Sequence, residues 1–115
     1  MLHHVGIEVS PAEIERAVEL FETVGFELVE PPPGLAEFTW LQREGTQVHL
    51  MPEEAPTAAR RGHLALVVPE LERALERLRA RGFELERRRS HWGSPRWVVL
   101  APGGHRVELM AFPPQ

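Results

Sequence analysis

The chain repeats itself, and this repeat constrains its fold more than any other feature. GTQVHLM from Gly45 matches GHRVELM from Gly104, and HVGIEVS from His4 matches HLALVVP from His63, both with a shift of 59 positions. Between these two matches, GFELVE also recurs as GFELER. Three matches in one order predict two modules of the same topology, and 115 residues are enough for a single domain.

The first module, residues 1–52, reads as a strand, a helix and three further strands. Residues 2–9 alternate between apolar and polar side chains, as in a half-buried strand. Ser10, Pro11 and Glu13 have the spacing of a capping box, so a helix is expected to begin there. The three later strands are expected at residues 26–30, 37–43 and 46–51. A two-residue turn at Glu44-Gly45 should join the last two.

The second module, residues 61–115, repeats this order. Leucines at helical spacing predict a helix near residues 70–81. Strands are expected near residues 83–89, 95–100 and 105–112. The polar segment Pro52–Arg60, bounded by prolines, is the expected linker. The sequence therefore predicts an α+β fold built from two βαβββ modules with curled mixed sheets.

Period-2 alternation places four donor side chains on one face of these sheets. If the apolar residues of the first and last strands pack under the helices, their neighbours His4, His49, His63 and Glu108 point the other way. The repeat relates position 4 to 63 and position 49 to 108. Three imidazoles and a carboxylate suit a divalent transition metal such as Zn, Ni, Co, Mn or Fe. The alternative is a set of hydrogen-bonded polar residues, and four donors at repeat-related positions favour the metal.

Side chains around these donors are expected to form a substrate site. The two-residue turn would pair Trp40 with His49 and Phe38 with Met51. The repeat would likewise place Val99 opposite Glu108 and Trp97 opposite Met110. We predict that the substrate contacts Phe38, Trp40, Trp97, Val99 and Arg106. These aromatic side chains would otherwise fill an ordinary core.

Glu8 and Glu108 are the candidate catalytic residues. Glu8 shares the inward face with the donors, and a carboxylate there needs a partner or a function. Arg106 is one possible partner, and a role as proton-transfer base is the other interpretation. Among the remaining histidines, His3 and His105 are expected at the surface.

Two surface features have weaker functional interpretations. His91 belongs to a loop that could cover the site. The basic run Arg87–Arg89 is typical of a solvated strand end, although it could attract an anionic part of a substrate.

Composition excludes several classes of protein. The sequence has no Cys, Lys, Asp, Tyr or Asn, which removes thiol nucleophiles, Schiff-base lysines and disulfides. A net charge of −4 argues against nucleic acid as a partner. No apolar run is long enough to span a bilayer, and the opening residues lack the pattern of a signal peptide. We therefore expect a cytoplasmic protein with a small-molecule substrate and no membrane or nucleic-acid partner.

Paired modules carrying HHVGIEV, QVHLM, GHLALVV and RVELMAF resemble the vicinal oxygen chelate superfamily. It includes glyoxalase I, methylmalonyl-CoA epimerase, extradiol dioxygenases, fosfomycin-modifying enzymes and bleomycin-binding proteins. The resemblance implies a glyoxalase-like open cup, a metal held by the same four donors, and a homodimer. His49 departs from the Glu or Gln that glyoxalase- and epimerase-like members often have there. The usual Asp-Pro-Asp/Glu-Gly turn appears as Ala101-Pro102-Gly103-Gly104, a change expected to affect only the turn.

The fold alone leaves the reaction open. The leading hypothesis is a metal-dependent lyase or isomerase that chelates two adjacent oxygens of a small carbonyl substrate. Glu108 or Glu8 would move the proton at the neighbouring carbon. The alternatives are an Fe(II) extradiol-type dioxygenase using His4, His63 and Glu108, and a non-catalytic protein that binds a bleomycin-like drug. A thiol transferase of the fosfomycin type is disfavoured, because few cations are expected near the site. The metal could lie within one chain or between two.

Overall fold

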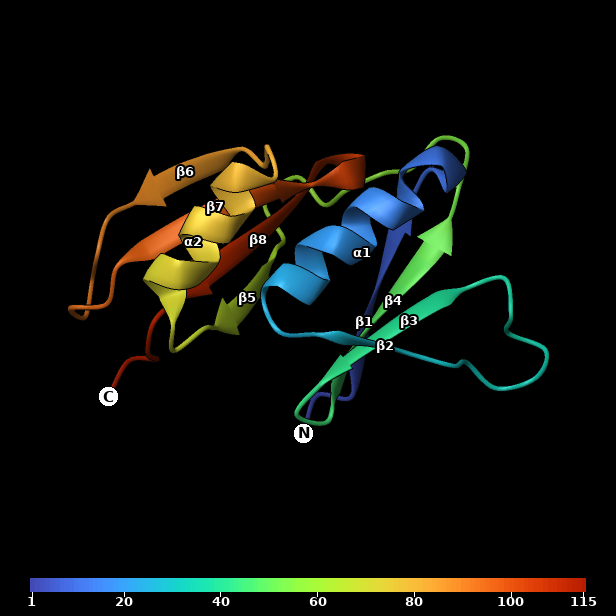
Figure 1. The fold of residues 1–115 in the computed structure, drawn as a ribbon, viewed down its shortest axis with the longest axis horizontal. Coiled ribbons are helices and arrows are strands. Elements are labelled where there is room, and N and C mark those ends of the chain that lie inside the picture. The colour runs from blue at the N-terminus through green and yellow to red at the C-terminus, as the bar shows by residue number, and fades with distance from the viewer.

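The computed structural model describes residues 1–115 and contains two similar modules, arranged side by side along an axis of 44 Å (Figure 1). The elements of the first module are β1 (His4–Val9), α1 (Ile14–Thr23), β2 (Glu27–Val29), β3 (Thr39–Arg43) and β4 (Thr46–Pro52). Those of the second are β5 (Leu64–Val67), α2 (Leu71–Ala80), β6 (Leu85–Arg88), β7 (Arg96–Ala101) and β8 (His105–Met110). The predicted α+β fold is confirmed.

Each module has one four-stranded mixed sheet. The strand orders are β1-β4-β3-β2 and β5-β8-β7-β6, so the two sheets have the same topology. The first strand of each module runs parallel to the last, and the other neighbours are antiparallel. The sheets do not close into a barrel, and β1 and β5 each form one edge.

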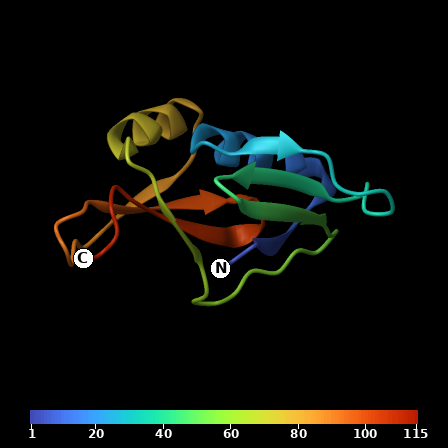
Figure 2. The ribbon, with the colours of Figure 1, turned by 90° about the horizontal axis from the view of Figure 1, so that it is seen from below.

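Both helices cover the same side of the sheets and contact each other (Figures 1 and 2). The core lies between the helices and the sheets, and the most deeply buried large side chains come from both layers. They include Leu20, Phe21, Leu41, Leu50, Leu75, Leu78 and Leu109. Because strand residues alternate, the other face of each sheet carries the remaining side chains. We call this second surface, on the side away from the helices, the open face of each module.

The start of the first helix differs from the predicted capping box. A 3₁₀ turn at Pro11–Glu13 precedes α1, and Ser10 makes no side-chain bond to a backbone amide. Its hydroxyl donates instead to the Glu13 carboxylate at 3.1 Å, while the Glu13 amide donates to the Ser10 carbonyl at 2.9 Å. The chain therefore enters the helix through a backbone turn.

The two hairpins differ in their turns, and this changes the register of the second module. In the first hairpin Arg43 pairs with Thr46 across a two-residue turn, with positive φ at Glu44 and Gly45. In the second hairpin three residues, Pro102–Gly104, separate the paired Ala101 and His105. The extra residue shifts β7 by one position against β8, and a one-residue shift exchanges the two faces of a strand.

The linker between the modules passes along the open side of the sheets, away from the helices (Figure 2). The amide and hydroxyl of Thr57 donate to Glu8 on β1 at 2.9 and 3.1 Å. A guanidinium nitrogen of Arg106 on β8 donates to the carbonyl of Arg60. The linker is therefore attached to both modules. No helix is both long enough and apolar enough to cross a lipid bilayer.

Candidate functional site

On the first module, three rings form a stack on the open face. Trp40 lies opposite His49 in the β3–β4 ladder, as predicted, and the two rings are parallel with centroids 3.9 Å apart. The ring of His4 stacks on the other side of His49 at 4.1 Å. Nε2 of His49 donates a hydrogen bond of 2.8 Å to the side-chain oxygen Oε1 of Gln47, whose NH₂ group donates in turn to Gln42. The stack itself is aromatic, and its only titratable groups are imidazoles.

Burial in this stack favours the neutral form of His49. Desolvation lowers the pKa of the His49 imidazole from its usual 6.5, and the nearby His4 and His3 lower it further. A neutral imidazole has a free lone pair, which is the form that can act as a base or a metal ligand.

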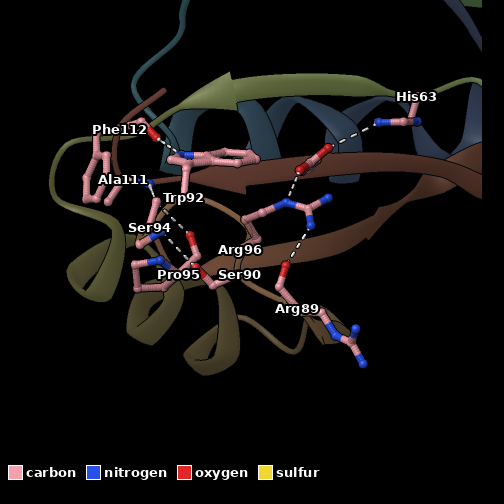
Figure 3. Close-up of polar contacts among 11 residues, drawn as sticks. His63, Arg89, Ser90, Trp92, Ser94, Pro95, Arg96, Ala111 and Phe112 are labelled. Carbon is pink, nitrogen blue, oxygen red and sulfur yellow. Dashed lines mark hydrogen bonds and ion pairs between the residues drawn. The ribbon is translucent and has the colours of Figure 1, made fainter. Parts of the chain in front are cut away.

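On the second module, a hydrogen bond joins the equivalent pair, and an ion pair with Arg96 holds its carboxylate. Nε2 of His63 lies 3.1 Å from Oε2 of Glu108, and Nε of Arg96 lies 2.6 Å from Oε1 of the same carboxylate. Figure 3 shows this chain of contacts running from His63 to Arg96 and on to the carbonyl of Arg89. Glu108 is 8% exposed, so both of its oxygens are occupied in a mostly dry position.

The four predicted metal donors form two pairs within one chain. His4 lies against His49, and His63 lies against Glu108. No three histidine or acidic side chains gather closely enough to hold a metal ion. The residue types fit a divalent transition metal. The two parallel imidazoles do not aim their in-plane nitrogens at one point, and Arg96 occupies one oxygen of Glu108. One chain in this conformation therefore holds the four candidate donors as two separate pairs.

Glu8 lines a cavity of about 340 Å³ on the open side, between β1 and the start of β5. His63, Met51 and Arg106 line the same cavity. Arg106, one of the two interpretations offered for Glu8, does not form an ion pair with it; Thr57 of the linker supplies the hydrogen bonds to Glu8 instead. Both bonds go to Oε1.

The shifted register overturns two of the predicted substrate contacts. Val98, not Val99, lies opposite Glu108, and Trp97 pairs with Leu109 instead of Met110. Val99 is fully buried in the core. Trp97 packs against the core on the helix side, where its ring lies 5.1 Å below the guanidinium of Arg79. Neither residue reaches the open face.

Two other predicted positions also differ. Phe38 lies just before β3, and the β3–β4 ladder begins at Thr39, so the expected pair with Met51 is absent from it. His105 is not solvated as expected. Its Nε2 lies 2.7 Å from the carbonyl of Glu8, which ties the second module to β1. His3 and His91 are exposed.

Two arginines of the second open face, Arg61 and Arg96, were missed by the sequence interpretation, which had named Arg106 as a substrate contact and the run Arg87–Arg89 as a possible anion attractant. A cavity of about 360 Å³ is lined by His63, Val98, Glu108, Arg61, Arg88, Arg96 and Arg106. The expectation that few cations lie near the site is therefore wrong. The signal was present, because Arg96, Val98, Arg106 and Glu108 share a face once the three-residue turn is recognised. The four arginines come from separate segments; Arg88 lies in the basic run Arg87–Arg89, but no single run marks all four.

Comparisons with solved structures show the same fold. A glyoxalase family protein from Bacillus anthracis is 25% identical, with a TM-score of 0.83, and the match covers 96% of this chain and 93% of that one. The oxidase ChaP-H2 is 20% identical, with a TM-score of 0.75 and coverages of 99% and 94%. TnmS3, an antibiotic binding protein from Streptomyces sp. CB03234, is 20% identical, with a TM-score of 0.69 and coverages of 96% and 93%.

A comparison with curated protein sequences gives no match. The family model that matches residues 2–109 is the one described as Glyoxalase/Bleomycin resistance protein/Dioxygenase superfamily. It spans both modules and all four candidate donors. The chain therefore belongs to the glyoxalase, bleomycin resistance protein and dioxygenase superfamily, the vicinal oxygen chelate superfamily that its repeated strands resemble.

Proposed function

We propose that this protein is a divalent-metal-dependent enzyme of the glyoxalase or epimerase type, acting on a small carbonyl compound with two adjacent oxygens. The observation that carries the proposal is the placement of four donors at repeat-related positions on the open faces. Each module contributes one pair of donors, one at or directly before its first strand and one on its last strand. His4, His49, His63 and Glu108 would hold the ion. Such an ion, when bound, polarises a carbonyl oxygen of the substrate.

Two copies of the chain would complete the site. One copy presents the imidazole pair of its first module and the His63–Glu108 pair of its second as half-sites. His4 lies on β1 and His63 directly precedes β5, and each of these two edge strands has an unpaired edge. A homodimer that brings the first module of one copy against the second module of the other joins the two halves. Arg96 would release Oε1 of Glu108 in this arrangement.

Glu8 is the residue that we assign to proton transfer, in preference to Glu108. Both bonds from Thr57 go to Oε1 of Glu8, which leaves Oε2 available toward the cavity that it shares with His63. Glu108 has both oxygens engaged, by Arg96 and His63. Thr57 would keep the Glu8 carboxylate oriented while the open cavity admits the substrate carbon.

Metal content tests the proposal. Purified wild-type protein should bind a transition metal in near-stoichiometric amount, measured by elemental analysis after dialysis. The single variants His49→Ala and Glu108→Ala should lose it, while His91→Ala, which removes an exposed loop histidine, should retain it. Failure of the wild type to take up any metal on titration would reject the proposal.

Mixing the two single variants tests whether the site is shared. If each site uses one module from each copy, a mixed dimer has one site with both changes and one intact site. Random exchange should then restore about a quarter of the wild-type metal content. If all four ligands came from one chain, mixing would restore none. Turnover of 2-oxoaldehydes, acyl-CoA epimers and catechols can then be screened on the loaded protein.

Metal-free ligand binding is the second candidate function. It is favoured by one specific observation: Arg96 already neutralises Glu108, so the carboxylate has a partner without an ion. A protein of this kind would bind its ligand equally well after metal removal by a chelator. The enzyme proposed above would lose turnover.

A further inference from the structure

We propose that the arginine cavity, the cavity of about 360 Å³ on the open face of the second module, binds a doubly charged oxyanion such as the phosphate group of a small ligand. Four guanidinium groups and a single carboxylate line it. The whole chain has a net charge of −4, so this concentration of positive charge does not follow from composition. The inference rests on the proposed function only in treating the open faces as the ligand site.

The positive charges of the cavity have few anionic partners within the protein. Arg96 is paired with Glu108 at 2.6 Å, and its side chain is 19% exposed. Arg88 contacts Glu86 at 3.1 Å, but both side chains are more than 40% exposed, and such surface pairs are weak. Arg61 and Arg106 form no ion pair; Arg106 donates to a backbone carbonyl. An excess of guanidinium charge therefore faces this space.

Guanidinium groups suit oxyanions because their planar forks donate two parallel hydrogen bonds. Arg88 and Arg96 are paired across β6 and β7, and Arg106 comes from the neighbouring strand β8. Donors from three adjacent strands can surround one tetrahedral group. A dianion offsets the mutual repulsion of these cations more fully than a single carboxylate does.

The position of the cavity also suggests how the rest of the ligand lies. His63 and Arg106 line both the arginine cavity and the cavity beside Glu8. A ligand with its phosphate among the arginines would extend its body past His63, toward Glu8 and the apolar side chain of Met51. The anion would thus anchor a substrate whose reactive part lies beside the residue that we assign to proton transfer.

Inorganic phosphate is the probe for this inference, titrated into chelator-treated protein at constant ionic strength and followed by calorimetry. Wild-type protein should bind phosphate saturably. Arg88→Gln and Arg106→Gln should each raise the Kd at least about tenfold, or about 1.4 kcal/mol. Gln is the residue at the repeat-related position 47, so the second change is compatible with this fold. Circular dichroism verifies that the variants are folded.

Arg87→Gln is the matched control. Arg87 pairs with Trp97 and therefore lies on the other face of β6, so this change removes the same charge from the same strand. It should leave the Kd within about twofold. Equal weakening in all three variants would overturn the inference, because the attraction would then be non-specific. Absence of saturable phosphate binding, or tighter binding of malonate than of phosphate, would overturn it too.

This experiment is independent of the metal. Phosphate binding that persists in a protein unable to take up metal supports the anion site and rejects the proposed metalloenzyme. Metal binding without phosphate affinity would support the proposed metalloenzyme and reject the anion site.

Discussion

The two modules share the same topology but differ in the side chains on their open faces. In each, the first strand pairs with the last in parallel and a hairpin completes the sheet. On the first module Trp40 lies opposite the candidate ligand His49, whereas on the second Val98 lies opposite the candidate ligand Glu108. The first face is a stack of rings, and the second is a network of guanidinium and carboxylate groups.

This contrast shows which parts of a repeat are fixed by the fold. The core-facing positions must stay apolar in both modules because they pack under the helices. The open faces carry no such requirement, so the two copies are free to differ there. An aromatic half and a cationic half together suit a ligand with a planar or apolar part and an anionic part.

The largest difference is expected between changes at the equivalent positions 49 and 108. Glu108→Ala leaves the mostly buried guanidinium of Arg96 without its carboxylate, and such a loss costs about 3–5 kcal/mol. His49→Ala removes a ring stack and one hydrogen bond, at a cost of about 1 kcal/mol. Urea unfolding of the metal-free variants measures both values. Equal losses would show that the two faces do not differ energetically.

The two turns should respond differently to the same substitution. Gly45 and Gly103 both have positive φ, where alanine is strained by about 1–2 kcal/mol. A Cβ at Gly45 meets open space, whereas one at Gly103 would lie 2.6 Å from the carbonyl oxygen of Glu8. Gly103→Ala should therefore lower the free energy of unfolding by about 2 kcal/mol more than Gly45→Ala. Thermal unfolding of both variants would show it, and equal shifts would mean that the contact between the second turn and β1 can relax.

Acid should weaken the first module through His49. Its pKa in the folded protein lies below the usual 6.5, so the unfolded chain binds more protons in the range below about pH 7. Stability is therefore full above the unfolded pKa and falls as the pH decreases toward the folded pKa. In His49→Gln, the free energy of unfolding should decrease less between about pH 7.5 and about pH 5.5 than in the wild type. Urea titrations at both pH values, with chelator present, measure this decrease. The control variant His91→Gln should lose as much stability between these two pH values as the wild type does. If His49→Gln also loses as much, the pH dependence comes from a group other than His49.

The strand faces and the register of the first module could be predicted because local sequence patterns determine them. The alternation of Val5, Ile7 and Val9 placed His4 and Glu8 on the opposite face of β1. The Glu44-Gly45 turn fixed the Trp40–His49 pair, since a two-residue hairpin leaves only one register. Both conclusions follow from neighbours in the chain.

What the sequence did not reveal depends on one turn and on distant partners. The prediction gave the second hairpin the strand register of the first. The second turn has one more residue, Pro102–Gly104, so Trp97 and Val99 were predicted on the wrong face of β7. The partner of Glu8 is Thr57, 49 positions away on the linker, and no periodicity predicts such a contact. The repeat predicted the topology of the second module but not its register.

The smallest expected effect concerns the arginines themselves. Arg88→Gln removes an exposed ion pair and one of four guanidinium groups that face the same cavity. The lost attraction to Glu86 and the relieved repulsion oppose each other, so the free energy of unfolding should change by less than about 0.5 kcal/mol. Arg87→Gln should be similarly mild, and urea unfolding compares the two. A loss above about 1 kcal/mol in Arg88→Gln alone would mean that this arginine serves the fold. A small change, beside a loss of phosphate affinity, would instead show that the second open face keeps its positive charge for a ligand.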